Sequence, residues 1–135
     1  FIEVKEGTKS IDPLIRNIQD SKLEYDQITV VSFHEEVVAK IKQEMHQVSA
    51  NLLIHFEDGT IPSEEIIKRL FQSNLDGVGV QNHPYLTIDL VNPILKEGKK
   101  VHVWTVDDID KAKSYKKMGL SSITTNIPGL IKSSI

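Results

Sequence analysis

The 135-residue sequence contains no cysteine, which excludes disulfide scaffolds, thiolate zinc sites, iron–sulfur clusters and cysteine nucleophiles. It also lacks an excess of positive charge: 16 Lys and Arg stand against 19 Asp and Glu, and the formal net charge of −3 excludes a generally basic nucleic-acid-binding protein. No uninterrupted apolar run approaches the roughly 20 residues that cross a bilayer. With 39% hydrophobic and 26% charged residues, the composition is typical of a globular domain with one core, and it leaves the cellular compartment open.

Six short apolar runs, rich in β-branched residues, predict strands that are buried on both faces. Their first residues lie 27, 23, 27, 23 and 21 positions apart, and the runs cover residues 1–5, 28–33, 51–56, 78–81, 101–106 and 122–125. The segments between the runs repeat apolar residues at helical spacing. The residues that we expect on the buried faces of these helices are Leu14, Ile15 and Ile18; Val37, Val38, Ile41, Met45 and Val48; Ile66, Ile67, Leu70 and Phe71; Leu90, Val91, Ile94 and Leu95; and Ile109, Ala112, Tyr115 and Met118.

Local signals mark several boundaries of these elements. Pro62 suits a first helical turn, Thr87 is a candidate N-cap, and Gly98 and Gly119 are candidate C-terminal stops. The pair Asp58-Gly59 predicts a turn. Strand and helix therefore alternate along the whole chain, which predicts a single α/β domain over residues 1–135, with a parallel sheet and helical crossovers.

Two architectures fit this alternation: an open doubly wound sheet and a (β/α)₈ barrel. A dinucleotide-binding sheet finds little support, because residues 77–79 hold two of the three glycines of the phosphate turn and lead into a strand, not into a helix. A complete barrel typically needs about 250 residues, and this chain supplies about six of the eight units. The pattern alone leaves the choice open.

Two charged residues stand inside the first predicted strand. Glu3 and Lys5 lie two positions apart, so their side chains share the face that a barrel would enclose, while Ile2 and Val4 turn toward the helices. Charges inside a strand are costly unless they are paired or ligated. The pair is therefore either an internal salt bridge at a solvated strand end, or a carboxylate for a hard cation beside an ammonium for an anion, as in phosphate-ester chemistry.

Trp104 lies near the end of the fifth predicted strand, and the period of two places it on the same face as His102. A tryptophan in a strand is more often a core residue, but the carboxyl ends of parallel strands are where α/β proteins bind ligands. The five histidines show no metal-binding spacing such as H-E-x-x-H, although His34 and His83 fall in loops that follow strands. No G-x-S-x-G motif is present, which disfavours an α/β-hydrolase.

Two segments near the carboxyl end carry a more specific pattern, residues 100–107 (KVHVWTVD) and residues 122–128 (SITTNIP). They resemble the strand v-x-v-W-T-v-N/D and the final strand g-I-x-T-D/N-x-P of the glycerophosphodiester phosphodiesterase family. Residues 2–5 (IEVK), 30–33 (VVSF) and 79–82 (GVQN) are similar to that family's third, fourth and sixth strands, in the same order. The resemblance covers essentially the whole chain.

The family has a TIM-barrel fold, so the resemblance implies a partial (β/α)₈ barrel that consists of strands three to eight with their crossover helices. It implies hydrolysis of a glycerophosphodiester to glycerol 3-phosphate and an alcohol, with a divalent cation (Mg²⁺ or Ca²⁺) that neutralises the phosphate and paired histidines as general acid and base. On this sequence it implies that Glu3 is a metal ligand, Lys5 a catalytic phosphate contact, and Phe33 and Trp104 walls of the substrate pocket. Asn126 stands where many relatives have Asp, which leaves its role open.

The family's first two strands, with their His-Arg-Gly and Glu-x-Asp motifs, and the His-Asp that follows them have no counterpart here. They carry the two catalytic histidines, a phosphate-binding arginine and most of the metal ligands. The chain also opens at Phe1, inside a predicted strand and without an initiator methionine. We therefore expect a fragment of a metal-dependent enzyme that is inactive alone and holds no cation tightly, because Mg²⁺ and Ca²⁺ want six or more oxygen ligands.

Two alternatives stay open: a non-catalytic phosphate-binding module of the same fold, and a different partial-barrel phosphate enzyme. The partners that we expect are a glycerophosphodiester substrate in the intact enzyme, no nucleic acid, and a second copy of the chain. Self-association is expected because strands three to eight of a barrel leave two open edges, residues 1–5 and 122–125. Both edges are apolar, and neither contains a proline that would block pairing.

Overall fold

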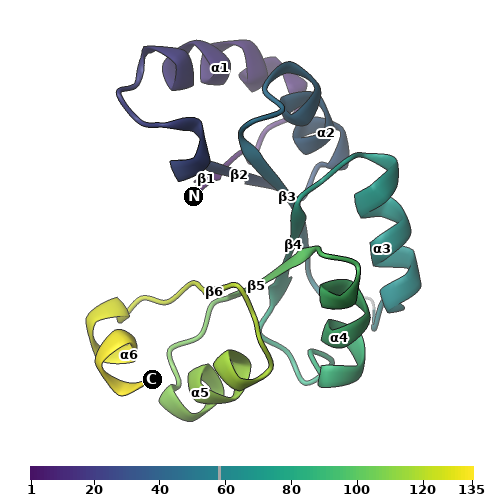
Figure 1. Ribbon diagram of the computed structural model, residues 1–135, viewed down its shortest axis with the longest axis vertical. Helices are drawn as coiled ribbons and strands as arrows, with labels where there is room; N and C mark the ends of the chain where they lie inside the picture. Colours follow the sequence, from purple (N-terminus) through teal and green to yellow (C-terminus); the bar gives the residue numbers. More distant parts are fainter. Residues whose placement is uncertain (58) are drawn as a thin grey trace. The chain divides into compact units, whose positions relative to one another are not determined.

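The structure is a computed structural model that describes residues 1–57 and 59–135, so the turn predicted at Asp58 lies outside the described residues. Strands and helices alternate along the chain (Figure 1). The strands follow one another in the sheet in the order β1-β2-β3-β4-β5-β6, and the paired strands run parallel. A doubly wound sheet reverses its strand order at a switch point, whereas a (β/α)₈ barrel keeps the chain order. The sheet order therefore decides for a partial (β/α)₈ barrel.

The strands occupy the predicted runs with shifted ends. Their bounds are β1, Ile2–Glu3; β2, Thr29–Ser32; β3, Ser49–Ile54; β4, Gly77–Gln81; β5, Lys100–Trp104; and β6, Ser122–Ile123. The largest shift is in β3, which begins and ends two residues earlier than predicted because Ser49 and Ala50 pair with Thr29 and Val30 of β2. The outermost strands of the sheet, β1 and β6, are shorter than their apolar runs.

The helices also match the predicted periodic segments, with one addition. Their bounds are α1, Ile11–Asp20; α2, Glu35–Glu44; α3, Ser63–Gln72; α4, Ile88–Lys96; α5, Ile109–Lys117; and α6, Pro128–Ser134, with 3₁₀ turns at Thr8–Ser10 and Tyr25–Gln27. The prediction did not include α6, which begins at its proline, a residue suited to the first helical position. Pro62 directly precedes α3, and its backbone oxygen accepts hydrogen bonds from Glu65 N and Ile66 N of the first turn, at 3.1 and 3.2 Å. No helix within the described residues is long and apolar enough to cross a membrane.

The chain divides into two compact units, residues 1–53 with 68–77 and residues 54–67 with 78–135. In the first unit α2 packs on β2, and α1 packs on α2. Its core includes the fully buried Val30 and Ala50 on the strands and Ile11, Val37 and Ile41 on the helices. The sequence analysis missed Ile11, the first residue of α1.

Two residues predicted to be buried in the first unit are exposed. Ile2 is 36% exposed, because β1 ends the sheet and pairs only with β2 in the described part of the chain. Phe71 is 53% exposed, whereas Leu70 beside it is fully buried. The helical period allowed both Leu70 and Phe71 on the apolar stripe of α3, but α3 turns only Leu70 inward.

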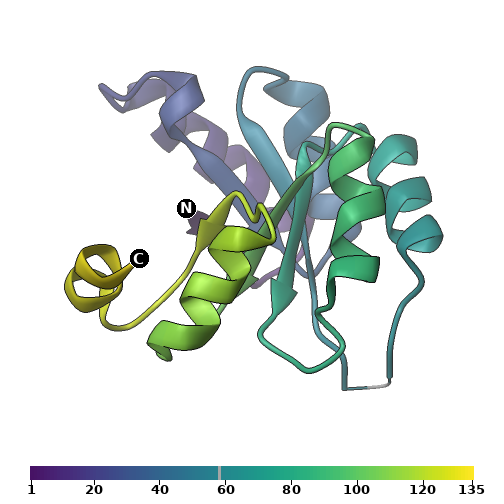
Figure 2. The same ribbon diagram turned by 60° about the horizontal axis from the view of Figure 1, so that its bottom comes forward.

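In the second unit α4 packs on β5, while α5 packs on β6 and on α6 (Figure 2). Thr87 occupies the N-cap position of α4, as predicted, but its side chain makes no capping hydrogen bond there. Gly98 and Gly119 follow the ends of α4 and α5 with φ angles of 72° and 85°. Other residues are strained at such angles, so glycine is the residue that ends these helices at low cost.

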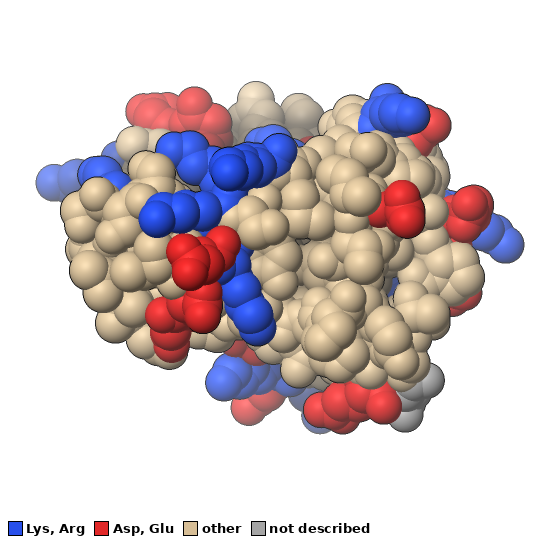
Figure 3. Space-filling model, turned by 90° about the horizontal axis from the view of Figure 1, so that it is seen from below, with Lys and Arg blue, Asp and Glu red and all other residues tan. Residues whose placement is uncertain are grey.

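The charged residues of α5 are ordered along the helix. Asp108 caps the amino end, where its carboxylate accepts a hydrogen bond from Lys111 N at 2.8 Å, and Asp110 lies in the first turn, whereas Lys116 and Lys117 lie in the last turn. This order matches the helix dipole and stabilises the helix. In Figure 3 basic and acidic side chains stand next to one another and do not form a surface of one sign.

Candidate functional site

The carboxyl end of β1 presents two charged side chains to solvent. Glu3 is the last residue of β1, Lys5 follows two residues later, and both are exposed. Val4 between them is buried, and its N–H donates to Val31 O at 2.9 Å. Glu3 and Lys5 therefore share the face opposite Val4, and both line a groove of about 380 Å³ beside β1. Within the described residues no ion pair joins the two side chains.

The hydroxyl of Ser32 fixes the backbone beneath these charges. Ser32 is fully buried at the end of β2, where its Oγ donates to Val4 O at 2.6 Å and accepts from His34 N at 3.1 Å. One side chain thus joins the end of β1 to the loop that opens α2. The sequence analysis did not single out Ser32, although a hydroxyl that ends an apolar run is a signal for such a role.

Phe33 reaches the same edge of the first unit. Glu3 pairs with Val31 in the β1–β2 register, so two residues further along Lys5 and Phe33 are level with each other. The Phe33 side chain is 40% exposed. The structure therefore brings Glu3, Lys5 and Phe33 together on neighbouring strands of the first unit.

Trp104 ends β5 in the second unit, where its side chain is half-buried. The backbone around it is held by Asn82, the residue after β4. Asn82 N donates to Trp104 O at 2.7 Å, and Asn82 Nδ2 donates to Thr105 O at 3.1 Å. The amide oxygen of Asn82 in turn accepts a hydrogen bond of 2.8 Å from the hydroxyl of Tyr115 on α5. The sequence analysis quoted Asn82 in the family pattern but assigned it no role.

Asp107 ties the loop after β5 to the loop after β6. Its Oδ1 accepts hydrogen bonds from Thr125 Oγ1 and Asn126 N, and its Oδ2 accepts one from Asn126 Nδ2, each at 2.8 Å. The hydrogen bonds from the side chain and backbone of Asn126, and then the one from Thr125, lower the pKa of the Asp107 carboxyl, because they favour its charged form. Asn126 thus acts as a donor to Asp107, which explains an amide at this position.

The histidine on β5 is a structural residue. His102 is 8% exposed, and its Nδ1 lies 2.7 Å from Ser122 Oγ on β6. Burial, and to a smaller extent the charge of Lys100, lowers the pKa of His102 to about 4. The imidazole is therefore neutral at physiological pH and bridges β5 and β6.

A cluster of three rings lies where β3 and β4 end. Phe56 is almost fully buried, and its ring centroid lies 5.5 Å from that of His83 and 6.0 Å from that of Tyr85. The rings of His83 and Tyr85 are 4.7 Å apart, and His83 Nδ1 accepts from Tyr85 N at 3.2 Å. These contacts order the loop that precedes α4, and they account for His83 as a packing residue.

The described residues do not supply a complete set of ligands for a divalent cation. In residues 1–57 and 59–135 no three His, Asp or Glu side chains gather into a group that could hold a metal ion. Glu3 offers one carboxylate, with two oxygens, whereas Mg²⁺ and Ca²⁺ take six or more oxygen ligands. The described residues therefore do not make up the cation site that the family resemblance implies.

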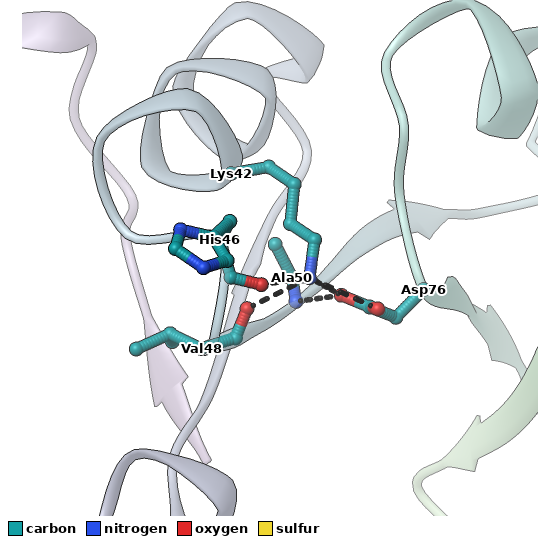
Figure 4. Close-up of polar contacts among 5 residues, drawn as sticks. All are labelled: Lys42, His46, Val48, Ala50 and Asp76. Carbon is teal, nitrogen blue, oxygen red and sulfur yellow. Dashed lines mark hydrogen bonds and ion pairs between the residues drawn. The ribbon is translucent and has the colours of Figure 1, made fainter.

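The amino ends of β3 and β4 are held by a different kind of contact, shown in Figure 4. Lys42 Nζ donates to the backbone oxygens of His46 and Val48, at 2.8 and 3.2 Å, and lies 2.9 Å from Asp76 Oδ2. The same carboxylate oxygen accepts from Ala50 N at 2.8 Å. The side chains of Lys42 and Asp76 are 10% and 30% exposed. This ion pair fixes the loops that enter two strands, at the end of the fold where barrels place residues for stability.

Solved structures share this fold. A glycerophosphodiester phosphodiesterase from Parabacteroides distasonis is 19% identical, with a TM-score of 0.76 over 97% of this chain and 54% of that chain. A phosphodiesterase from Oleispira antarctica, in complex with the product sn-glycerol-3-phosphate, is 19% identical, with a TM-score of 0.79 over 93% of this chain and 49% of that chain. This likeness confirms the partial (β/α)₈ barrel, and the chain spans about half the length of both structures.

The sequence comparisons define the family. Residues 2–130 match the model of the glycerophosphoryl diester phosphodiesterase family. Glycerophosphodiester phosphodiesterase GDPD4 of Arabidopsis thaliana is 34% identical over 55 residues, which are 41% of this chain and 16% of that protein. The chain belongs to the glycerophosphoryl diester phosphodiesterase family, as its W-T-V and T-N-x-P segments predicted.

Proposed function

We propose that this chain is the carboxyl-terminal part of the catalytic barrel of an enzyme that hydrolyses glycerophosphodiesters to glycerol 3-phosphate and an alcohol. The family match over residues 2–130 carries the proposal. The Oleispira antarctica structure supports the product class, because that phosphodiesterase of the same fold holds sn-glycerol-3-phosphate. The carboxyl ends of β1, β2 and β5 are where a barrel of this kind places its reacting groups.

In this proposal each side chain at those strand ends has a separate task. Lys5 binds the phosphate, and its ammonium offsets the negative charge that grows on the phosphate oxygens during hydrolysis. Glu3 contributes a carboxylate to a divalent cation, Mg²⁺ or Ca²⁺, which would further neutralise the phosphate. Phe33, in the first unit, and Trp104, in the second, each offer an aromatic side chain to the glycerol carbons.

The cation site and the acid–base pair need groups beyond those described. We propose that the remaining carboxylates, the two catalytic histidines and a phosphate-binding arginine come from sequence outside residues 1–135. The groups of such a site act as a unit, so the 135-residue chain alone has no hydrolase activity.

Hydrolysis assays test this proposal. The 135-residue chain and the longest polypeptide that the gene encodes are each incubated with glycerophosphocholine, with Mg²⁺ and with Ca²⁺. We expect turnover only from a polypeptide with His-Arg-Gly and Glu-x-Asp motifs upstream of Phe1. In that polypeptide Glu3→Gln and Lys5→Met each lower kcat/KM on the order of 100-fold, whereas Lys9→Met, a control in the same segment, leaves it unchanged.

Two outcomes would contradict the proposal. Turnover by the 135-residue chain alone would show that the reacting groups lie within it. Phosphate binding without turnover, in a gene product that lacks the upstream motifs, would support the alternative of a non-catalytic phosphate-binding module.

We also propose that the 135-residue chain associates with a second copy through β1 and β6. Both strands end the sheet order in the described part of the chain, so one side of each is open to a further strand. Beside β1, Phe1 and Ile2 are 67% and 36% exposed. Beside β6, a groove of about 520 Å³ is lined by apolar residues, among them Ile123 and Ile131, and by an equal number of lysine and hydroxyl side chains. Light scattering that gives 15.2 kDa, the mass of one chain, up to near-millimolar concentrations would refute this proposal.

A further inference from the structure

Asn82 occupies an unusual position among the loops of the second unit. It is the first residue after β4, yet three of its polar groups are bonded to Trp104, Thr105 and Tyr115, which lie 22, 23 and 33 residues further along the chain. Its backbone N–H holds Trp104 O at 2.7 Å, and its side-chain amide holds Thr105 O at 3.1 Å. The backbone carbonyls of two successive residues, Trp104 and Thr105, are therefore bonded to this one residue.

The Asn82 amide is itself held in one orientation. The hydroxyl of Tyr115 donates to Asn82 Oδ1 at 2.8 Å, so the amide nitrogen is the atom that points to Thr105 O. Tyr115 is 7% exposed on the inner face of α5. Burial raises the pKa of Tyr115 above its ordinary value, which keeps the hydroxyl protonated and able to donate.

We infer that Asn82, oriented by Tyr115, is a positioning residue that sets the place of the Trp104 side chain at the carboxyl end of β5. The inference rests on the proposed function in one respect: the position of Trp104 matters for the substrate because Trp104 is proposed as a pocket wall. The hydrogen bonds run from the Tyr115 hydroxyl through the side-chain amide to Thr105 O, the residue after Trp104, while the backbone N–H of Asn82 holds Trp104 O. Removing the hydroxyl weakens the contact of the amide with Thr105 O, and removing the amide abolishes it, without touching the indole itself or the backbone bond from Asn82 N to Trp104 O.

The chain has a single tryptophan, so intrinsic fluorescence reports on Trp104 alone. The variants are Tyr115→Phe, which removes only the hydroxyl, and Asn82→Ala, which removes the whole amide. Ser73→Ala is the matched control, because it also removes one half-buried side-chain hydrogen bond of 2.8 Å, to Glu35 in the first unit. Circular dichroism shows whether each variant is folded, and acrylamide quenching measures how accessible the indole is.

We expect both variants to raise the acrylamide quenching constant of Trp104 and to shift its emission, while Ser73→Ala matches the unmodified chain. The net contribution of one hydrogen bond changes the ratio of fixed to displaced conformers by about five-fold, which such quenching resolves. Unchanged quenching in folded Tyr115→Phe and Asn82→Ala would overturn the inference. If Asn82→Ala does not fold, Tyr115→Phe decides the question alone.

The same proteins separate this inference from the proposed function, because the quenching experiment needs no ligand. In the unmodified chain, sn-glycerol 3-phosphate is then titrated while Trp104 emission is followed. If the variants free Trp104 but the ligand leaves its emission unchanged, the positioning role stands and the pocket role of Trp104 fails. If the ligand changes the emission but the variants do not free Trp104, the pocket role stands and Asn82 does not set the position of Trp104.

Discussion

The amino ends of β3 and β4 and the carboxyl ends of β5 and β6 are held by contrasting kinds of contact. At the amino ends, in the first unit, a lysine that is 10% exposed pairs with Asp76 and with two backbone oxygens (Figure 4). At the carboxyl ends, in the second unit, the amide of Asn82 and the exposed carboxylate of Asp107 hold neighbouring loops. The amino ends are held by a partly buried ion pair, and the carboxyl ends by hydrogen bonds nearer the surface.

This difference separates stability from function within one fold. A shielded ion pair is expensive to break, because it leaves a charge without its partner, so the Lys42–Asp76 contact supports the fold. Exposed hydrogen bonds contribute less to stability, but they set where loops lie, and loops at the carboxyl ends of barrel strands carry the chemistry. Changes at the amino ends should therefore alter stability, and changes at the carboxyl ends should alter the position of side chains.

The largest effect on stability is expected from Lys42→Met. The variant leaves the Asp76 carboxylate without its cation and frees the backbone oxygens of His46 and Val48. We expect the free energy of unfolding to fall by about 2 to 3 kcal/mol, measured by urea denaturation. Lys40→Met, on the same helix, is the control and should cost little. Equal losses from the two variants would show that the ion pair does not distinguish the amino ends.

An effect of similar size is expected from pH, through His102. The unfolded imidazole takes up a proton near its ordinary pKa of 6.5, whereas the folded one does so only near pH 4. The unfolded state thus binds more protons between these values, and stability falls as pH drops from 6.5 to 4. The NMR titration of the His102 ring should show a midpoint near pH 4, and Lys100→Met should raise it. A midpoint near 6.5 would contradict the buried, neutral imidazole.

The smallest effect is expected from exchanging Asp107 and Asn126, which are hydrogen-bonded to each other in the loops after β5 and β6. Asn126→Asp puts a second carboxylate against Asp107, so that charge repulsion replaces a hydrogen bond. The double variant, Asp107→Asn with Asn126→Asp, again has one amide and one carboxylate in contact. We expect a lower melting temperature for the single variant at neutral pH and recovery in the double variant. A double variant no more stable than Asn126→Asp would contradict this pairing.

The contribution of the Asp107–Asn126 contact to stability also depends on pH. The pKa of the Asp107 carboxyl is lower in the folded state than the ordinary 3.8, so its contribution to stability is present above that value and is lost as pH falls through the folded pKa. The difference between the unmodified chain and Asp107→Asn should therefore be present at neutral pH and vanish in acid. A difference that persists in acid would show that the carboxylate charge is not its source.

The order of elements could be predicted from the sequence because alternation and apolar periodicity are local properties. The apolar periodicity wrongly predicted that Ile2 and Phe71 are buried, because their burial depends on which other element covers them. The pairings of Asn82 with Thr105 and of Asp107 with Asn126 could not be predicted either. They join loops about 20 residues apart in the sequence, and only the sheet order brings those loops together.

The placement of Glu3, Lys5 and Phe33 on one edge could be predicted, because the register of two neighbouring parallel strands brings their carboxyl ends level. The sequence also led to the expectation that Glu3 alone is too little to hold Mg²⁺ or Ca²⁺, because these ions take six or more oxygen ligands, and this stays a prediction.

A titration of the isotope-labelled chain with sn-glycerol 3-phosphate tests most directly whether these strand ends bind a phosphate ester. We predict shifts of the backbone amide signals of Lys5, Phe33 and Trp104, with glycerol alone as the control, and weaker shifts at Lys5 and Phe33 in the Lys5→Met variant. Shifts confined to the lysines of α5 and α6, or equal shifts in the Lys5→Met variant, would contradict the account.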